Sequence, residues 1–347
     1  MINLIDKKIL FFCPNFLGYD SIIAGELIKK GAKVELYNER PSSNPLIKAI
    51  IRVNPKLLNK MSHRYFLSIL HKESKEEFDY VFIIKGEAMS TEIIAKMKEI
   101  FPEAIFIYYS WDSIRNLKHM DRKIQYFHKA FSFDREDCKT IANVDYLPLF
   151  FSKKESSNEN LPSTKDSKYN LSFIASLHSD RYKVLKKILI EIKNKRPDTK
   201  IYLFLYYSSK FIFFLKKILD TNFFRVPYKM INWTPLSQQA VFDKLSETEI
   251  VIDINHPNQS GLTMRTIEAL VLKKKLITTN TNIRYEDFYS PENFLIVDRT
   301  RPVIPVEFLS TPYQEIERSI INSYSLESWL KKIFDSQEAL YPFKERI

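Results

Sequence analysis

Glycine and cysteine are scarce in this chain, with five and two copies among 347 residues. So little glycine excludes collagen-like and glycine-linker architectures, and any glycine-rich phosphate loop must be minimal. Cys13 and Cys138 cannot form a disulfide framework, which is typical of a protein in a reducing compartment.

Long apolar runs are also missing. The longest, such as Phe211 to Leu215, are far shorter than the about 20 residues that a membrane-spanning helix needs. The N-terminal apolar stretch is short, is interrupted by Lys7 and Lys8, and is followed by no small-residue cleavage site, unlike a signal peptide. We therefore expect a cytoplasmic protein.

Several catalytic motifs are absent from the sequence. No CxxC, HExxH, DxD or histidine cluster has metal-ligand spacing, so we expect no metal and no other cofactor. The sequence also lacks GxGxxG, a Walker P-loop and a GxSxG elbow, which disfavours an NAD dehydrogenase, a P-loop NTPase and an α/β-hydrolase.

What the chain has in excess is positive charge, with 53 Lys and Arg against 42 Asp and Glu, a formal net charge of +11. This charge suits nucleic acid, an anionic membrane or a phosphorylated ligand, or it simply reflects an AT-rich genome. No RRM, zinc-finger or basic-repeat pattern supports nucleic acid as a partner. The hydrophobic share of 45% is enough for a large core.

Strand-like and helix-like segments alternate along both halves of the chain. The strand-like runs are 8–12, 33–37, 80–84, 104–109, 130–133, 171–175, 201–206, 250–254, 276–279 and 294–297. The helix-like runs are 20–31, 57–72, 91–100, 119–127, 135–143, 180–195, 236–247, 262–273 and 312–322, with one or two terminal helices in 326–345. Near-continuous apolar strands separated by helices indicate parallel sheets covered on both faces.

A polar segment, 152–169, divides the two halves and is the best linker in the chain. We therefore predict an α/β fold of two Rossmann-like domains facing a central cleft. The domains span 1–151 and 170–325, and 326–347 forms terminal helices that can cross back to the first domain. Ligands bind beyond the carboxyl ends of the strands in such sheets.

The segment 250–280 carries the most chemical information. A strand is followed by a polar loop and then by a helix that begins near Leu262 or Thr263, so free backbone N–H groups can bind an anion beside Ser260 and Gly261. Arg265 and Glu268 share one face of this helix, where they can pair with phosphate and accept hydrogen bonds from ribose. The alternative is a Ser or Gly cap with an ordinary ion pair.

Two further strand-end loops of the second half are candidate donor sites. His178 and Arg181 precede or open a helix, where Arg181 can bind phosphate or can be a solvated cap residue. Asn232 and Trp233 precede a helix that Ser237 can cap, and Trp233 suits a nucleobase or a buried anchor.

The first half offers carboxylates after its strands. Asp20, Glu87 and Asp112 follow predicted strands, and Asp112 ranks first as a catalytic base. Asp20 or Ser21 can instead cap a helix. Asp134 and Asp137 resemble a capping box with Asp in place of Glu.

The segments 131–138, 172–185, 232–237 and 260–280 together resemble the GT-B glycosyltransferases of bacterial surface-polysaccharide synthesis, in particular the CgeB-like branch of capsule and lipopolysaccharide enzymes. The resemblance covers about residues 105–290. The region from Ser260 to Glu268 corresponds to the part that holds the diphosphate and ribose of a nucleotide sugar in that family. Ala175 stands where the family often has glycine.

The resemblance implies metal-independent transfer of a sugar from a nucleotide-sugar donor to a glycan or lipid-linked acceptor hydroxyl. The alternatives are a nucleotide-sugar epimerase of the same architecture and a non-catalytic protein that binds a small ligand or nucleic acid. Two basic, apolar segments also suggest peripheral binding to an anionic membrane at its inner face, namely 46–72 and 210–217. In 210–217, however, we expect the Phe run to pack against a sheet.

Overall fold

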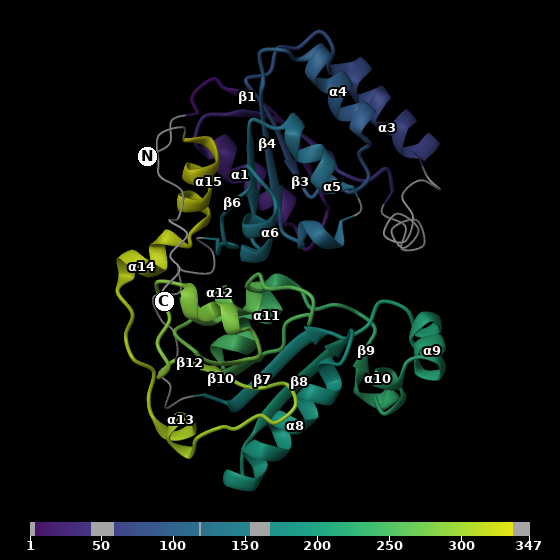
Figure 1. Cartoon of the computed structure of the whole chain (residues 1–347). Helices are drawn as coiled ribbons and strands as arrows, with labels where there is room; N and C mark the ends of the chain where they lie inside the picture. Colours follow the sequence, from purple (N-terminus) through teal and green to yellow (C-terminus); the bar gives the residue numbers. More distant parts are fainter. Residues whose placement is uncertain (1–3, 43–58, 118, 153–166, 336–347) are drawn as a thin grey trace. The chain divides into compact units, whose positions relative to one another are not determined.

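The computed structural model describes residues 4–42, 59–117, 119–152 and 167–335, which form two compact units (Figure 1). The first domain comprises Met1–Leu149 together with the helix α15 (Leu326–Phe334), and the second comprises Phe150–Ser325. Each domain contains a six-stranded sheet in which every strand pair is parallel. The predicted α/β class with two Rossmann-like domains is confirmed.

The first sheet has the strand order β2-β1-β3-β4-β5-β6. Its strands are β1 (Lys8–Cys13), β2 (Lys33–Asn38), β3 (Tyr80–Ile84), β4 (Ile105–Ser110), β5 (Lys129–Ser132) and β6 (Asp145–Tyr146). Its helices are α1 (Tyr19–Lys29), α3 (Asn59–Glu73), α4 (Thr91–Ile100), α5 (Met120–Lys123), α6 (Arg135–Thr140) and α15, with 3₁₀ turns η2 (Ile114–Asn116) and η3 (Ile124–Tyr126). The chain leaves β1 for β2 on one side and returns to β3 on the other, so the topological switch point lies between β1 and β3.

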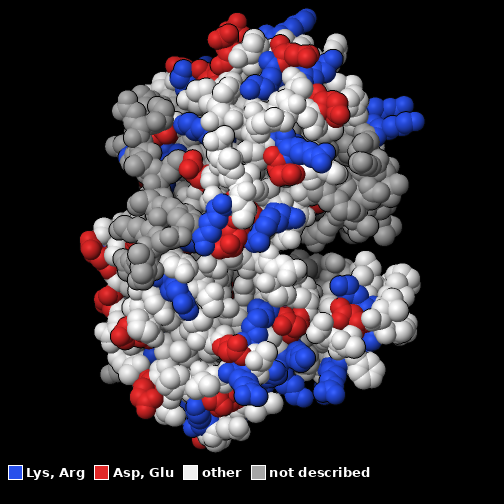
Figure 2. Space-filling model, in the orientation of Figure 1, with Lys and Arg blue, Asp and Glu red and all other residues white. Residues whose placement is uncertain are grey.

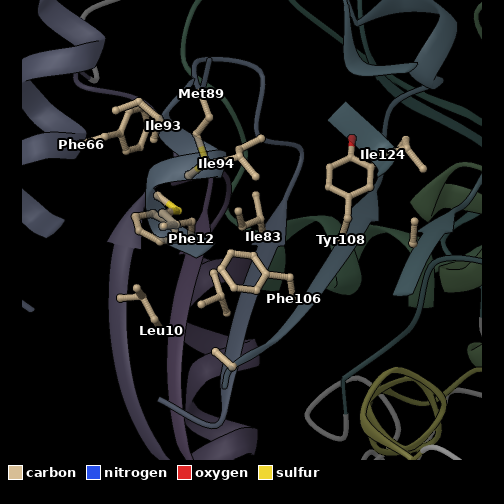
Figure 3. Packing of buried hydrophobic residues seen from close by; sticks show 14 of the residues in the cluster. Leu10, Phe12, Phe66, Ile83, Met89, Ile93, Ile94, Phe106, Tyr108 and Ile124 are labelled. Carbon is tan, nitrogen blue, oxygen red and sulfur yellow. The ribbon is translucent and has the colours of Figure 1, made fainter. Parts of the chain in front are cut away.

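The strands of the first sheet are buried on both faces, which is why they read as continuous apolar runs. On one face, Phe12, Ile83 and Phe106 pack against Phe66 of α3 and neighbouring residues (Figure 3). On the other, Phe82 lies between Phe11, at 4.9 Å between ring centroids, and Trp329 of α15. The terminal helix therefore completes the core of the first domain.

The second sheet has the order β12-β11-β10-β7-β8-β9. Its strands are β7 (Tyr169–Ser176), β8 (Ile201–Tyr206), β9 (Ile231–Asn232), β10 (Thr248–Asp253), β11 (Lys275–Thr278) and β12 (Phe294–Ile296). Its helices are α8 (Arg181–Lys195), α9 (Lys210–Leu219), α10 (Thr221–Phe224), α11 (Gln238–Ser246), α12 (Met264–Val271), α13 (Val306–Ser310) and α14 (Arg318–Ser323), with η5 (Tyr228–Met230) and η6 (Thr281–Tyr285). Here the switch point lies between β7 and β10.

Two expectations about helices are wrong. The helix predicted over 312–322 is only α14, and Thr311, which precedes Pro312, has an extended conformation with ψ 143° of the kind that a following proline favours. The Phe run of 210–217 does not pack as a whole against a sheet: Phe213 is buried, whereas Phe211 and Phe214 are exposed.

The other basic segment, 46–72, is described only from residue 59 onward, so its first part lies outside the described residues. In α3 the apolar side chains Phe66, Ile69 and Leu70 are buried in the core of the first domain. Most of the predicted linker 152–169 also lies outside the described residues. Within the described part of the chain, no helix has the length and apolarity to cross a bilayer.

Candidate functional site

The switch point of the second domain is held together by Arg181, the first residue of α8. Its Nε donates to the carbonyl of Ile254 at 2.8 Å, and Nη1 donates to the carbonyl of Ser176 at 2.6 Å. These carbonyls follow or end the neighbouring strands β10 and β7. Burial lowers the pKa of Arg181 to about 10, so the guanidinium remains charged near neutral pH. Arg181 is thus a buried residue whose hydrogen bonds connect the ends of two strands, and it is not a solvated cap residue.

The start of α12 rests on Asp253, the last residue of β10. Thr263 is the N-cap: its hydroxyl accepts from the N–H of Arg265 at 3.1 Å and donates to Asp253 Oδ2 at 2.9 Å. Thr266 donates to the same oxygen at 3.3 Å. Burial raises the pKa of Asp253. The cap is therefore Thr263 and not Ser260 or Gly261, because Asp253 fixes the threonine hydroxyl in place.

Arg265 and Glu268 form an ion pair on the first turns of α12, in which Arg265 Nη1 donates to Glu268 Oε2. Burial raises the pKa of Glu268. The Nε of Arg265 is buried and has no hydrogen-bond partner among the described residues. A buried N–H of a charged group without an acceptor costs free energy, which an incoming anion would recover.

Arg299, which sequence reasoning missed, completes this edge of the second sheet. Its Nη2 and Nε contact the two carboxylate oxygens of Asp180 at 2.5 and 3.3 Å. Its Nη1 donates to Asn255 Oδ1 at 3.1 Å and to Thr279 Oγ1 at 3.0 Å. Although burial acts in the opposite direction, the hydrogen bonds from Arg299 lower the pKa of Asp180. The available signal was its position just after the strand-like run 294–297.

The loop that carries the predicted anion-binding residues is fixed by Asn280. Its Nδ2 donates to the carbonyls of Ser260 and Gly261, at 3.0 Å each. The side chain of Leu262, the next residue, is buried. Ser260 to Glu268 thus form the end of this loop and the first turns of α12, after the carboxyl end of β10.

His178 lies beside this edge, with its ring centroid 5.1 Å from that of His256. Its Nδ1 is 2.9 Å from the hydroxyl of Ser179. Burial, with smaller effects of Arg181 and His256, lowers the pKa of His178 to about 3. The imidazole is therefore neutral at physiological pH and can offer a hydrogen bond or a ring face, but no charge.

This partly buried histidine predicts a loss of stability in acid. Below pH 6.5 the unfolded chain protonates His178 while the folded chain does not, so stability present above about pH 6.5 is lost as the pH falls. Between pH 7 and pH 5 we expect a loss of about 2 kcal/mol that His178→Gln does not show. Urea unfolding of both proteins at the two pH values measures this. An equal pH effect in both would contradict it.

Asn232 and Trp233 lie two strands away from the switch point, at β9. Trp233 packs against Phe213 and Tyr228, with ring centroids 5.6 and 5.1 Å apart, and Asn232 Nδ2 donates to the carbonyl of Leu205 at 3.4 Å. Trp233 thus has the contacts of a packing anchor. Ser237 caps α11 by accepting from the N–H of Ala240, as predicted.

In the first domain, two of the predicted carboxylates meet at the carboxyl edge of the sheet. Lys85, just after β3, donates to Asp112 just after β4, and its Nζ is 3.7 Å from Glu87 Oε2. Lys85 has a left-handed φ of 70°, a strained conformation for a residue with a side chain. The strained turn therefore brings Asp112 and Glu87 to one buried ammonium group.

Three further charged residues, which the sequence did not reveal, surround this turn. Arg40 Nη2 donates to Glu87 at 2.7 Å, and its Nε is 2.8 Å from Glu39 Oε1. Burial raises the pKa of the fully buried Glu39. Burial also lowers the pKa of Lys123 to about 8, and its Nζ donates to the carbonyl of Gly86 at 3.4 Å. Alternating charges in a buried cluster hold each side chain in a fixed place.

Asp20 lies in the first turn of α1, near the switch point of the first sheet. Gly18 is the N-cap, in a left-handed conformation with no side-chain cap, so neither Asp20 nor Ser21 caps the helix. Asp20 is 9% exposed, and its Oδ1 is buried without a hydrogen-bond partner among the described residues. Such an oxygen can accept a hydrogen bond from the hydroxyl of a ligand.

The aspartates after β5 have structural roles. Asp134 caps α6 by accepting from the N–H of Glu136 at 3.0 Å, as predicted. The capping box also predicts a reciprocal hydrogen bond from the N–H of Asp134 to the side chain of Asp137. This prediction is wrong, because the N–H of Asp134 donates to Ser132 Oγ. Asp137 accepts instead from Ser132 Oγ and from the N–H of Ile114, at 2.7 Å each.

Comparison with solved structures identifies the fold. The chain superposes on the OtsA apo structure with a TM-score of 0.62, 8% identity and coverage of 97% and 100% of the two chains. It superposes on the trehalose 6-phosphate synthase of Burkholderia multivorans with a TM-score of 0.58 and 7% identity, and the match covers 94% of this chain and 95% of the synthase. The chain has the GT-B glycosyltransferase fold.

A third solved structure of this fold contains ligands. The HepE protein of Anabaena, in complex with UDP and glucose, matches with a TM-score of 0.54, 10% identity and coverage of 95% and 96%. No protein-family model and no curated protein sequence matches the chain. At these identities, the structural likeness establishes the fold and not the activity.

Proposed function

We propose that the protein is a glycosyltransferase that binds the nucleoside diphosphate of a nucleotide sugar at the switch point of the second domain. The main support is the buried Nε of Arg265 at the N-terminus of α12, which has no hydrogen-bond partner in the described part of the chain. A helix N-terminus and a guanidinium group together favour a diphosphate. The fold, shared with a protein that binds UDP and glucose, supports the same assignment.

The residues of this edge take complementary parts in the proposed donor site. Arg265 turns from Glu268 to the diphosphate, and Glu268 then accepts hydrogen bonds from the ribose hydroxyls. Arg181 and Arg299 hold the surrounding loops and add positive potential. His178, Asn232 and Trp233 are the candidates for nucleotide contacts. Charge on the leaving diphosphate is stabilised by arginine and the helix dipole, so the reaction requires no metal ion.

The first domain would bind the acceptor, a glycan or lipid-linked hydroxyl. When the bond from the anomeric carbon to the diphosphate breaks, the acceptor oxygen bonds to that carbon and its proton passes to a base in an inverting reaction. Asp112, Glu87 and Asp20 are the candidate bases. The resemblance of residues 105–290 to CgeB-like capsule and lipopolysaccharide enzymes supports a role in cytoplasmic synthesis of surface polysaccharide, with an acceptor held at the inner face of the membrane.

A panel of nucleoside diphosphates tests the proposal by thermal shift. We expect one or more of them to raise the melting temperature, because a ligand at about 100 times its Kd stabilises a protein by about 2.7 kcal/mol. The matching nucleotide sugar should then release its diphosphate when acceptor is present. Absence of any shift would contradict the donor site, and interconversion of nucleotide sugars without diphosphate release would indicate an epimerase.

A further inference from the structure

The apolar stripe of α9 faces solvent. In an amphipathic helix, residues at spacings of three and four form one face, and in a globular domain this face normally packs on the core. In α9 the stripe is Phe211, Phe214, Leu215 and Ile218, which are 71%, 60%, 40% and 67% exposed. The core contact of this helix is made instead by Phe213, which is fully buried.

Neighbouring residues extend this stripe into a patch. Leu219 at the end of α9, Phe224 in α10 and Tyr228 in η5 are 82%, 69% and 52% exposed. We call the seven side chains the α9–α10 patch: Phe211, Phe214, Leu215, Ile218, Leu219, Phe224 and Tyr228. In Figure 1, α9 and α10 stand out beside β9 at the margin of the second domain. Clusters of exposed apolar side chains, unlike single exposed ones, are typical of interaction sites.

Other side chains than those of the patch hold α9 on the second domain. Phe213 packs against Tyr207, Phe223 and Trp233, with ring centroids 5.5, 6.1 and 5.6 Å away. Lys217 donates to the carbonyl of Val226 at 3.0 Å, which joins α9 to the segment that follows α10. The exposed side chains are therefore additional to those that hold α9 on the domain.

The charges around the patch favour one kind of partner. Between residues 208 and 230 the basic residues are Lys210, Lys216, Lys217, Arg225 and Lys229, and the single acidic residue is Asp220. Figure 2 shows uncharged surface with basic side chains beside it at this margin of the second domain. Protein interfaces are depleted in lysine, whereas helices that lie in a bilayer surface combine Phe and Leu with Lys and Arg.

An apolar recess adjoins the patch. Met230, which ends the same η5 turn as Tyr228, lines a cavity of about 330 Å³ together with Leu185, Leu189 and Ile190 of α8. Lys186 and Lys193 also line it. The recess thus has the same combination of apolar side chains and lysine as α9.

We propose that the α9–α10 patch docks the second domain on an anionic phospholipid bilayer, with α9 lying in the plane of the headgroups. This inference goes beyond the proposed transfer reaction and does not depend on it. It assigns membrane contact to residues of the second domain, whereas α3 of the first domain buries its apolar side chains.

Sedimentation of the full chain with vesicles tests the proposal. We expect binding to vesicles of phosphatidylcholine and phosphatidylglycerol at low salt, and weaker binding to phosphatidylcholine alone. Each basic residue near the surface contributes a factor of about five. Binding should weaken at ~1 M salt, where the Debye length is about 3 Å. If the unmodified protein stays in the supernatant with anionic vesicles at low salt, the proposal is wrong.

Matched variants locate the contact. Phe211→Glu with Ile218→Glu should reduce vesicle binding at least tenfold, because two exposed apolar anchors become acidic. Val303→Glu with Val306→Glu changes the net charge equally at 68% and 51% exposed positions of the same domain, and should bind nearly as well as the unmodified protein. Equal losses in both would show that charge alone matters and would overturn the docking site.

Two further measurements distinguish membrane docking from misfolding of the variant and from dimer formation. Circular dichroism and the thermal shift with nucleoside diphosphate should be unchanged in Phe211→Glu with Ile218→Glu, so the proposed donor site and the docking surface can fail independently. Sedimentation equilibrium should show the same mass for this variant and the unmodified protein. A dimer that only the unmodified protein forms would show that a second copy covers the patch, and would overturn membrane docking.

Discussion

Arg265→Ala should weaken the binding of nucleoside diphosphate by one to two orders of magnitude. A hydrogen bond between a guanidinium group and phosphate contributes about 1.5–3 kcal/mol, and the proposed contact uses the Nε that has no partner in the described residues. Isothermal titration with the diphosphate selected by thermal shift measures the change. Arg301→Ala is the matched control, because Arg301 is an exposed arginine of the same domain.

The variant also removes the partner of Glu268, which is buried. A weakened affinity could therefore reflect a disturbed turn, and Arg265→Ala combined with Glu268→Gln removes the stranded carboxylate. If Arg265 binds phosphate, the double variant stays at least as weak as the single one. Recovery of nearly full affinity in the double variant would mean that Arg265 only neutralises the charge of Glu268 and does not bind phosphate.

Asp112→Asn should lower kcat by two to four orders of magnitude while the affinity for the donor changes less than about twofold. The amide keeps the size of the side chain but cannot take a proton from the acceptor. Lys85 retains Glu87 at 3.7 Å, so the buried ammonium group still faces a carboxylate and the domain should fold. Steady-state turnover with donor titration separates the two parameters.

Asp121→Asn is the matched control for this prediction, since Asp121 is an exposed aspartate of the first domain. It should leave both kcat and donor affinity unchanged. An unchanged kcat in Asp112→Asn would indicate that Asp20 or Glu87 is the base instead. Both are buried: Glu87 lies at the same sheet edge as Asp112, and Asp20 lies in the first turn of α1.

The sequence predicted the sheets well for a physical reason. Strands buried on both faces, such as β3 and β10, must be apolar throughout, and this pattern can be read without the tertiary structure. The same reasoning placed Arg265, Glu268 and Asp112 directly after strands or at a helix start. Their candidate roles follow from the rule that the carboxyl ends of parallel strands meet at one edge.

Pairings between distant segments could not be predicted in this way. Arg299 contacts Asp180 across 119 positions, and Arg40 contacts Glu87 across 47. Neither pair shares a motif, because the sheet order and not the spacing brings the residues together. Apolar content likewise does not show which side of a helix faces the core, so the exposed stripe on α9 became visible only in the structure.

The proposed donor site places a nucleoside diphosphate at the carboxyl edge of β7 and β10 in the second domain. A crystal structure of the full chain with the diphosphate selected by thermal shift tests it most directly. We expect phosphate oxygens at the N-terminus of α12, within hydrogen-bond distance of Arg265 Nε, and a ribose hydroxyl that donates a hydrogen bond to Glu268. A diphosphate bound elsewhere, with the Arg265–Glu268 ion pair intact, would contradict it.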